Sequence, residues 1–256
     1  MHAMEWETID VDRLASLGVF NEALGIVPNI DPMAAWPGDA PIRILLHRGD
    51  LALDGLAFDT NRFLSLDADM LIVDGNLILQ GDLDVEQFDV GTPGYLVVKG
   101  DLKAGSLFLT GQFECLVRGD LSATAVVLGS EASSGRLRVG GTVQAPVTVM
   151  VDFPIKAGAL EGTFFVQNRH PYEDLVIAIG DASATRRIRV EEDEEFGQYW
   201  LLRLPEGTSQ AELDTEAFPE CSILTEAAQA DHEGTGGGLS LKEVLRKHGA
   251  QGFKAA

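Results

Sequence analysis

The chain has 256 residues, of which 45% are hydrophobic, and 40 acidic against 19 basic side chains give a formal net charge of −21 at pH 7. So large a negative charge argues against binding to nucleic acid or to an anionic membrane, because both ligands need a basic surface. No apolar run approaches the roughly 18 residues that span a bilayer, and the first residues lack the basic and apolar regions expected of a secretory signal. Two cysteines, Cys115 and Cys221, are too few for a disulfide framework. We expect a cytoplasmic protein.

Residues 1–41 are predicted to form an N-terminal helical cap and linker. Apolar side chains at helical spacing between residues 8 and 24 favour a helix. Clusters of Asp, Gly and Pro between Pro28 and Pro41 are typical of a linker.

Residues 42–152 contain a repeated phrase. Segments that begin at Leu79, Val98 and Val117 each continue with x-Gly-Asp-Leu, and a degraded copy begins at Val139. Their spacings are 19, 19 and 22 residues, which indicates a repeat architecture whose units stack on one another. Two related copies occur earlier in the chain: Gly49-Asp50-Leu51 and Gly75-Asn76-Leu77.

Short alternating apolar runs between these phrases suit strands rather than helices. A unit of about 19 residues is too short for the two helices of a helical repeat. The sequence therefore predicts a mainly β protein built as a right-handed parallel β-helix, a β-solenoid with non-repeating caps at both ends. We expect Leu79, Val98, Val117 and Val139 to stack in one internal column.

The Gly-Asp pair of each phrase is predicted to form a corner between strands. Gly100 and Gly119 are expected to adopt positive φ there. Asp82, Asp101 and Asp120 are expected to stack in one column and to accept backbone N–H bonds, as in Asx turns. A calcium ladder is the alternative, although calcium takes roughly six to eight oxygen ligands and each unit offers one acid. We predict no cofactor and no metal ion.

Residues 153–256 are predicted to form a C-terminal α/β cap with a flexible, Gly-rich hinge near 231–238. Ser240 and Glu243 have the spacing of a helix capping box. The expected elements are strands at 175–179 and 199–204 and helices at 208–216 and 239–247. The densest acidic run of the chain also lies here and consists of Glu191, Glu192, Asp193, Glu194 and Glu195.

The repeated phrase across residues 71–151 resembles that of bactofilins, bacterial β-helix proteins that form polymers. The resemblance implies a β-helix with coils of similar length. Bactofilins have short ends, which leave the terminal coils free to stack end to end. This chain carries about 40 residues before its first phrase and about 100 after its last, and these flanks are expected to block polymerisation.

Catalytic motifs are missing: the five histidines form no metal-ligand pair, and the sequence has neither a nucleophile elbow nor a phosphate-binding loop. We predict a non-catalytic, monomeric or dimeric protein that engages a basic protein partner through Glu191–Glu195. A bacterial immunity protein that neutralises a toxin is the leading example. Two alternatives stay open: a bactofilin-like structural scaffold that assembles by stacking, and a carbohydrate-active β-helix enzyme.

Overall fold

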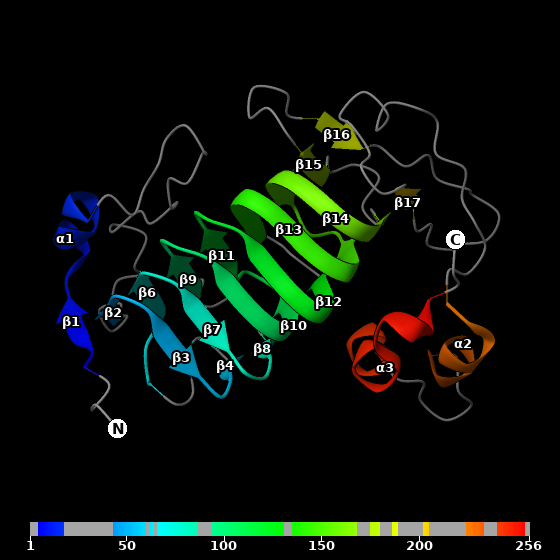
Figure 1. Cartoon of the computed structure of the whole chain (residues 1–256), viewed down its shortest axis with the longest axis horizontal. Helices are drawn as coiled ribbons and strands as arrows, with labels where there is room; N and C mark the ends of the chain where they lie inside the picture. The colour runs from blue at the N-terminus through cyan, green and yellow to red at the C-terminus, as the bar shows by residue number, and fades with distance from the viewer. Residues whose placement is uncertain are drawn as a thin grey trace, which may run out of the picture.

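The protein is mainly β. The computed structural model describes residues 5–17, 43–59, 62–63, 66–86, 94–130, 135–167, 175–179, 186–188, 202–204, 224–232 and 240–253. The strands form one large mixed sheet, mostly parallel, that curls round on itself (Figure 1). The expected mainly β fold with stacked parallel strands is confirmed at this level.

The parallel strands pair in three series, named here ladders A, B and C, and the chain visits them in that order. Ladder A contains β2 (Ile44–Arg48), β6 (Met70–Asp74), β9 (Tyr95–Val98), β11 (Glu114–Val117), the first parts of β13 (Arg136–Val151) and β14 (Ile155–Gln167), and β15 (Leu175–Ile179). Ladder B contains β3 (Leu51–Leu53), β7 (Leu77–Leu79), the first parts of β10 (Leu102–Thr110) and β12 (Leu121–Ser130), and the middles of β13 and β14. Ladder C contains β4 (Leu56–Asp59), β8 (Leu83–Glu86) and the last parts of β10, β12, β13 and β14.

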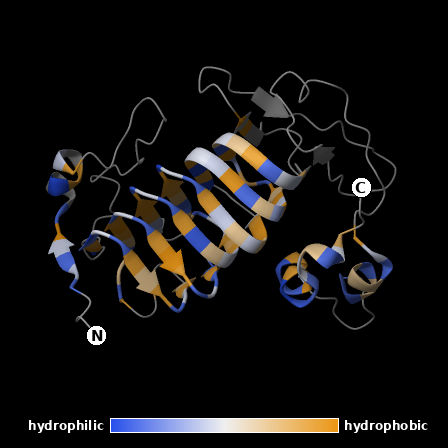
Figure 2. Cartoon of the chain, viewed as in Figure 1, coloured by the Kyte–Doolittle hydropathy of each residue, from blue (hydrophilic) through white to orange (hydrophobic). Residues whose placement is uncertain are grey.

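The core lies inside the curled sheet, because alternate side chains of every ladder point inward and are apolar. Figure 2 shows this alternation as neighbouring orange and pale or blue segments along the strands. At one end, Phe58, Phe63 and Phe113 pack edge to face with ring centroids 5.0–5.9 Å apart. Cys115 is fully buried in the same cluster, as a small apolar residue would be.

The expected internal column is right for three of its four members. Val98, Val117 and Val139 occupy equivalent positions of successive ladder A strands. The expected position of Leu79 is wrong, because Leu79 pairs with Leu53 in ladder B. Val73 holds the corresponding place in ladder A. The phrase that begins at Leu79 therefore belongs to a different corner from the phrases that begin at Val98 and Val117.

Both ends of the parallel ladders meet antiparallel strands. At the first end, β1 (Glu7–Ile9) pairs with β2, and β5 (Arg62–Phe63) pairs with β4. At the other end, β16 (Arg186–Ile188) pairs with β15, and β17 (Leu202–Leu204) pairs with β14. An antiparallel strand covers a parallel edge without continuing the repeat, so these strands protect the backbone groups of the edges that they pair with.

Helices cover parts of the outer surface (Figure 1). In helix α1 (Val11–Ser16), Leu14 clusters with outward side chains of ladder A. Helices α2 (Glu226–His232) and α3 (Leu241–His248), with the 3-10 turn η3 (Gly249–Gly252), pack on the outward apolar side of ladder C. Among the described residues, no helix has the length and apolar character to cross a membrane.

Several of the helices and strands predicted from the sequence are present in the structure. The helix expected within 8–24 is present as the shorter α1, and residues 18–24 lie outside the described part. The strand at 175–179 is β15, and the helix expected at 239–247 is α3, with its Ser240–Glu243 capping box intact. Of 199–204 only β17 is described. The linker at 28–41 and the helix at 208–216 lie outside the described residues. Of the hinge expected near 231–238, residues 231 and 232 instead form the end of helix α2, and 233–238 lie outside the described residues.

Candidate partner-binding face

The acidic run predicted to contact a partner, Glu191–Glu195, lies outside the described residues. The described residues offer a different candidate, the outward side of ladder B, named here the open face. Successive strands place six outward side chains in one register row: Ala52, Ile78, Lys103, Ser122, Gln144 and Glu161. Five of the six are exposed and Ser122 is half-buried. Ile78, 43% exposed, stands out because large aliphatic side chains are usually buried.

The outward sides of the other two ladders differ from the open face. On ladder C, Phe108, Leu128 and Val149 are buried and cluster with Val244 and Leu245 of α3. On ladder A, a set of buried outward side chains clusters with Ile9 and Leu14: Ile44, Leu46, Met70, Ile72, Tyr95, Val97 and Leu116. Ladder B therefore provides an exposed sheet surface within the described part of the chain.

Backbone caps organise the corner between ladders A and B. Asp50, Asn76, Asp101 and Asp120 form a row, named here the Asx column, in which each side chain reaches to the next strand layer. Four main-chain N–H groups donate to these side chains: Asn76 N to Asp50 Oδ1 (2.8 Å), Asp101 N to Asn76 Oδ1 (2.8 Å), Asp120 N to Asp101 Oδ1 (2.9 Å) and Thr142 N to Asp120 Oδ1 (2.7 Å). The expected capping of backbone N–H groups is confirmed, although each cap joins two layers rather than closing its own turn.

Asp82 is not part of this column, which corrects the expected Asp82/Asp101/Asp120 row. It lies at the corner between ladders B and C, where its Oδ1 accepts the N–H of Ser106 at 2.7 Å. The ladder register aligns Leu77, not Leu83, with Leu102. Asn76 therefore occupies the place expected for Asp82. The two are easily exchanged in sequence, because both corners of this layer have a Gly-Asx-Leu phrase.

Gly100 and Gly119 are needed for space and not for backbone conformation. Among the described residues, positive φ occurs at Gly49 but not at Gly100 or Gly119, so the expectation for the latter two is wrong. A Cβ on Gly119 would lie 2.1 Å from Asp101 Oδ1, and one on Gly100 would lie 2.3 Å from Asn76 Oδ1. Each glycine therefore makes room for the capping side chain of the preceding layer.

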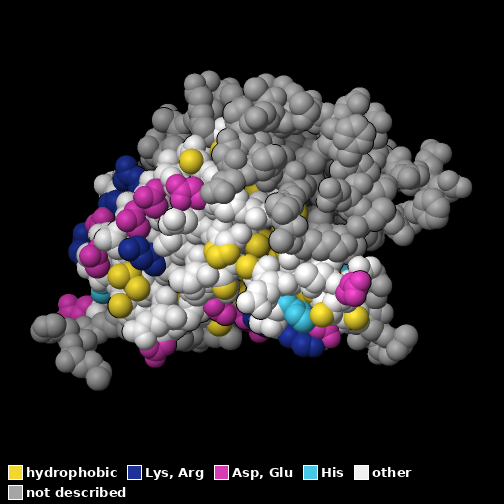
Figure 3. All heavy atoms as spheres, turned by 45° about the vertical axis from the view of Figure 1, so that its right-hand side comes forward, with side chains coloured by type: hydrophobic (Ala, Val, Ile, Leu, Met, Phe, Trp, Pro, Cys, Tyr) yellow, Lys and Arg dark blue, Asp and Glu magenta, His cyan; other side chains and the backbone are white. Residues whose placement is uncertain are grey.

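Acidic side chains border the open face on both sides. Asp50, Asp101 and Asp120 follow the corner with ladder A, whereas Asp54 and Asp82 follow the corner with ladder C. All five are exposed or half-buried. Figure 3, which views the molecule from one side, shows acidic and basic side chains interspersed over one part of the described surface and a second group of charged and histidine side chains apart from them. Basic side chains lie among these acids, because Arg48, Lys99 and Arg118 stand at the corner with ladder A and Lys103 stands in the row. Acids still outnumber bases here, so the field across the open face favours cations.

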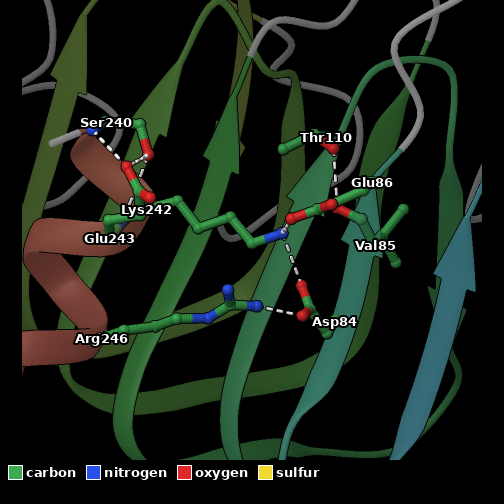
Figure 4. Close-up of polar contacts among 8 residues, drawn as sticks. All are labelled: Asp84, Val85, Glu86, Thr110, Ser240, Lys242, Glu243 and Arg246. Carbon is green, nitrogen blue, oxygen red and sulfur yellow. Dashed lines mark hydrogen bonds and ion pairs between the residues drawn. The ribbon is translucent and has the colours of Figure 1, made fainter. Parts of the chain in front are cut away.

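Helix α3 is fixed to ladder C by a buried cation (Figure 4). Lys242 Nζ lies 2.6 Å from Asp84 Oδ1 and 2.7 Å from Glu86 Oε1, and its side chain is only 10% exposed. One helical turn further, Arg246 pairs with Asp84 and lies with its guanidinium carbon 5.0 Å from the centre of the Phe108 ring. Sequence reasoning missed this contact, whose only local signals were acids alternating along one strand and bases four residues apart on one helix.

A second polar cluster lies on the outward side of ladder A. Glu114 is buried and pairs with Arg136 at 2.8 Å. Burial raises the pKa of Glu114, and the neighbouring Arg136 and Arg138 oppose that rise. Burial, with the charge of Glu114, raises the pKa of Tyr95 to about 12. These side chains form a polar network between neighbouring strands of ladder A. They do not have the arrangement of a catalytic nucleophile beside its base.

Reactive or metal-binding chemistry finds little support within the described residues. Burial raises the pKa of the Cys115 thiol to about 12, so it stays protonated at neutral pH. Across the described ranges, no group of three or more His, Cys, Asp or Glu is arranged to hold a metal ion. His47 lies within hydrogen-bond distance of two backbone carbonyls, those of Glu5 and Asp50, which is a structural arrangement.

Comparison with known proteins gives no relative: no family model, no curated protein and no solved structure matches the chain. The function has to be inferred from the surface itself.

Proposed function

We propose that ladders A, B and C are the three sides of a right-handed parallel β-helix closed by non-repeating ends. Two observations support this reading. The chain visits the ladders in the same order in each layer, and equivalent residues return at the same position, as Val98, Val117 and Val139 do. A β-helix supplies rigid, flat sides, and a side of that kind is suited to binding another macromolecule.

On this scaffold the protein works as a non-catalytic binding protein for a basic protein partner, of which a bacterial toxin neutralised by an immunity protein is the leading example. The observation that carries the proposal is the open face, an exposed sheet surface with acids along both corners. Complementary charge would steer a basic partner onto this face, and Ile78 near one end of the row would add apolar contact. The partner's basic substrate-binding surface would then be masked.

The test compares two charge reversals of equal size. Asp54→Lys with Glu161→Lys alters the open face at exposed positions outside the Asx column, whereas Glu5→Lys with Glu226→Lys alters exposed positions elsewhere. A partner captured by the unmodified chain should associate about tenfold more slowly with the open-face variant and nearly normally with the control variant. Association should also slow as salt rises above about 0.15 M, where the Debye length is about 8 Å.

A toxin-like partner adds a functional measurement: the open-face variant should protect the partner's target less well than the control variant at the same concentration. An association rate that ignores both the salt and the open-face reversal would contradict the electrostatic proposal. Turnover of a sugar substrate by the purified chain would instead support the enzyme alternative.

The acidic run is a second candidate contact of the same kind. Reversing Glu192, Asp193 and Glu194 to Lys should lower the association rate more than it raises the dissociation rate, if the run takes part in steering. Comparison with the open-face variant then shows which acidic surface the partner meets. An unchanged rate would remove the run from the proposed interface and leave the open face as the sole candidate.

A further inference from the structure

Basic side chains gather on the outward side of ladder A, in contrast to the acidic character of the whole chain. Arg136 and Arg138 alternate along β13, so both point to the same side of the sheet. Arg138 is in register with Lys156 on β14, and neighbouring strands lie about 4.8 Å apart. These three residues are named here the basic cluster. Glu114 is in register with Arg136 on the preceding strand.

The charges of the basic cluster are only partly compensated within the described residues. Glu114 neutralises Arg136 at 2.8 Å. Arg138 Nη1 has less than 1 Å² of accessible surface and no hydrogen-bond partner in the described part of the chain. Lys156 makes no ion pair with a described residue. Two positive charges therefore remain side by side.

A buried guanidinium donor without an acceptor destabilises a fold, and a second cation beside it adds repulsion. Burial first, and then the charge of Arg136, lowers the pKa of Arg138, and the charge of Glu114 opposes that change. Nη1 itself is closed to a ligand, but the Arg138 side chain as a whole is half-buried. An oxyanion at its accessible edge would offset the repulsion between the two cations, because guanidinium groups bind phosphate and carboxylate oxygens through N–H donors.

We propose that Arg138 and Lys156 form a binding site for a phosphate-type dianion. Two neighbouring positive charges, of which Arg138 is only partly offset by Glu114, fit a dianion better than a single carboxylate. Arg136, whose side chain is 25% exposed, is held by Glu114 at one side of the site and positions its edge. The basic cluster lies on ladder A and the proposed partner surface on ladder B, so the site goes beyond the proposed function and can be tested without a protein partner.

The probe is inorganic phosphate, measured by isothermal titration calorimetry and by thermal unfolding against chloride at equal ionic strength. The expected result is saturable binding and a higher unfolding midpoint in phosphate, since a ligand that binds only the folded state stabilises it. Arg138→Gln should weaken binding about tenfold or more, because the variant loses charge-assisted hydrogen bonds to the anion. Lys103→Gln, which removes an equal charge from the open face, should leave binding unchanged.

A second variant and a second readout guard against simple loss of folding. Lys156→Gln should weaken phosphate binding while the variant unfolds cooperatively in chloride. Arg138→Gln should unfold at the same or a higher temperature than the unmodified chain in chloride, because it removes an unpaired charge, and it should lose the rise in phosphate. Failure of the unmodified chain to bind phosphate, or equal binding by Arg138→Gln, would overturn the proposal.

Discussion

At the scale of single residues, the Asx column shows why Gly-Asp-Leu recurs. Asp101 caps the N–H of Asp120 in the next layer, and Gly119 leaves space for the oxygen that does so. The chemistry of this corner could be predicted from the sequence, because Asp caps backbone N–H groups wherever chains turn. Which Asx belongs to the column could not, since Asp82 sits in an equivalent phrase at another corner and only the long-range register separates the two.

The column predicts different outcomes for two substitutions of Asp101. Asp101→Asn should be nearly neutral, because Asn76 already serves as a cap in the same column through its Oδ1. Asp101→Ala should lower the free energy of unfolding by about 1–2 kcal/mol, because the N–H of Asp120 loses its acceptor. Urea denaturation measures both values. An equal loss in both variants would show that the carboxylate charge, and not the cap, supports the corner.

Glu114 predicts a pH dependence. Burial raises its pKa in the folded state, so the folded protein holds this proton more tightly than the unfolded chain. The resulting contribution to stability is complete below the unfolded pKa and is lost as the pH rises through the raised folded pKa. Relative to Glu114→Gln, the unmodified chain should therefore lose stability as the pH rises above about 4.3.

Urea denaturation at a series of pH values measures that difference, with Glu226→Gln, at an exposed site in α2, as the control. The expected burial effect would be contradicted if the free energy of unfolding of the unmodified chain, minus that of Glu114→Gln, stayed constant or increased with pH.

Calcium is predicted to be dispensable for folding. Asp50, Asp101 and Asp120 each use one oxygen on a backbone N–H group, and a calcium ion takes roughly six to eight oxygen ligands. Thermal unfolding with a calcium chelator should give the same midpoint as unfolding with added calcium. A midpoint that falls by several degrees on chelation would reveal a bound ion, because a ligand lost from the folded state lowers its stability.

At the scale of elements, the sequence predicted those features that depend only on residues close together in the chain. The capping box of α3 needs only Ser240 and Glu243, which are three residues apart, and it forms as expected. The docking of α3 depends instead on Lys242 meeting Glu86, a pair separated by 156 positions in sequence. No local pattern could specify that contact, because it depends on where the helix returns in space.

Lys242 is expected to hold α3 on ladder C. Lys242→Met should destabilise this contact by about 2 kcal/mol, because Asp84 and Glu86 lose a cation whose side chain is only 10% exposed. Lys247→Met, which removes a 55% exposed partner of Asp231, should cost less than about 1 kcal/mol. Hydrogen exchange of the α3 amides measures both effects. Equal exchange in the two variants would show that apolar packing alone holds the helix.

At the scale of the whole molecule, the antiparallel strands at the ends bear on assembly. The departure of the flanks from the repeat pattern predicted that the ends would differ from the repeats, and β1, β5, β16 and β17 pair with the terminal parallel strands. Which side of the sheet would remain exposed could not be predicted, because α1, α2 and α3 choose their sides through tertiary packing.

Deleting residues 1–10 should convert the protein into one that associates. The deletion removes β1 and exposes the edge of β2, and an uncovered strand edge pairs readily with another chain. Sedimentation velocity should show growth with concentration for the deletion variant but not for the unmodified chain. Glu7→Ala, which removes ion pairs to Arg13 and Arg48 but keeps the β1 backbone, is the control. Growth of the unmodified chain would instead support the scaffold alternative.

The ladders also determine how the molecule would respond to mechanical load. Hydrogen bonds between successive layers point along the direction in which the strands stack, so tension along that direction pulls each bond along its own length. Bonds loaded in this way open a few at a time from an end, in contrast to strands that are sheared past one another. Releasing a layer such as the one from Val98 to Val117, 19 residues, would lengthen the chain by roughly 60–70 Å. The molecule should therefore yield in a series of small steps, beginning at whichever end strand detaches first.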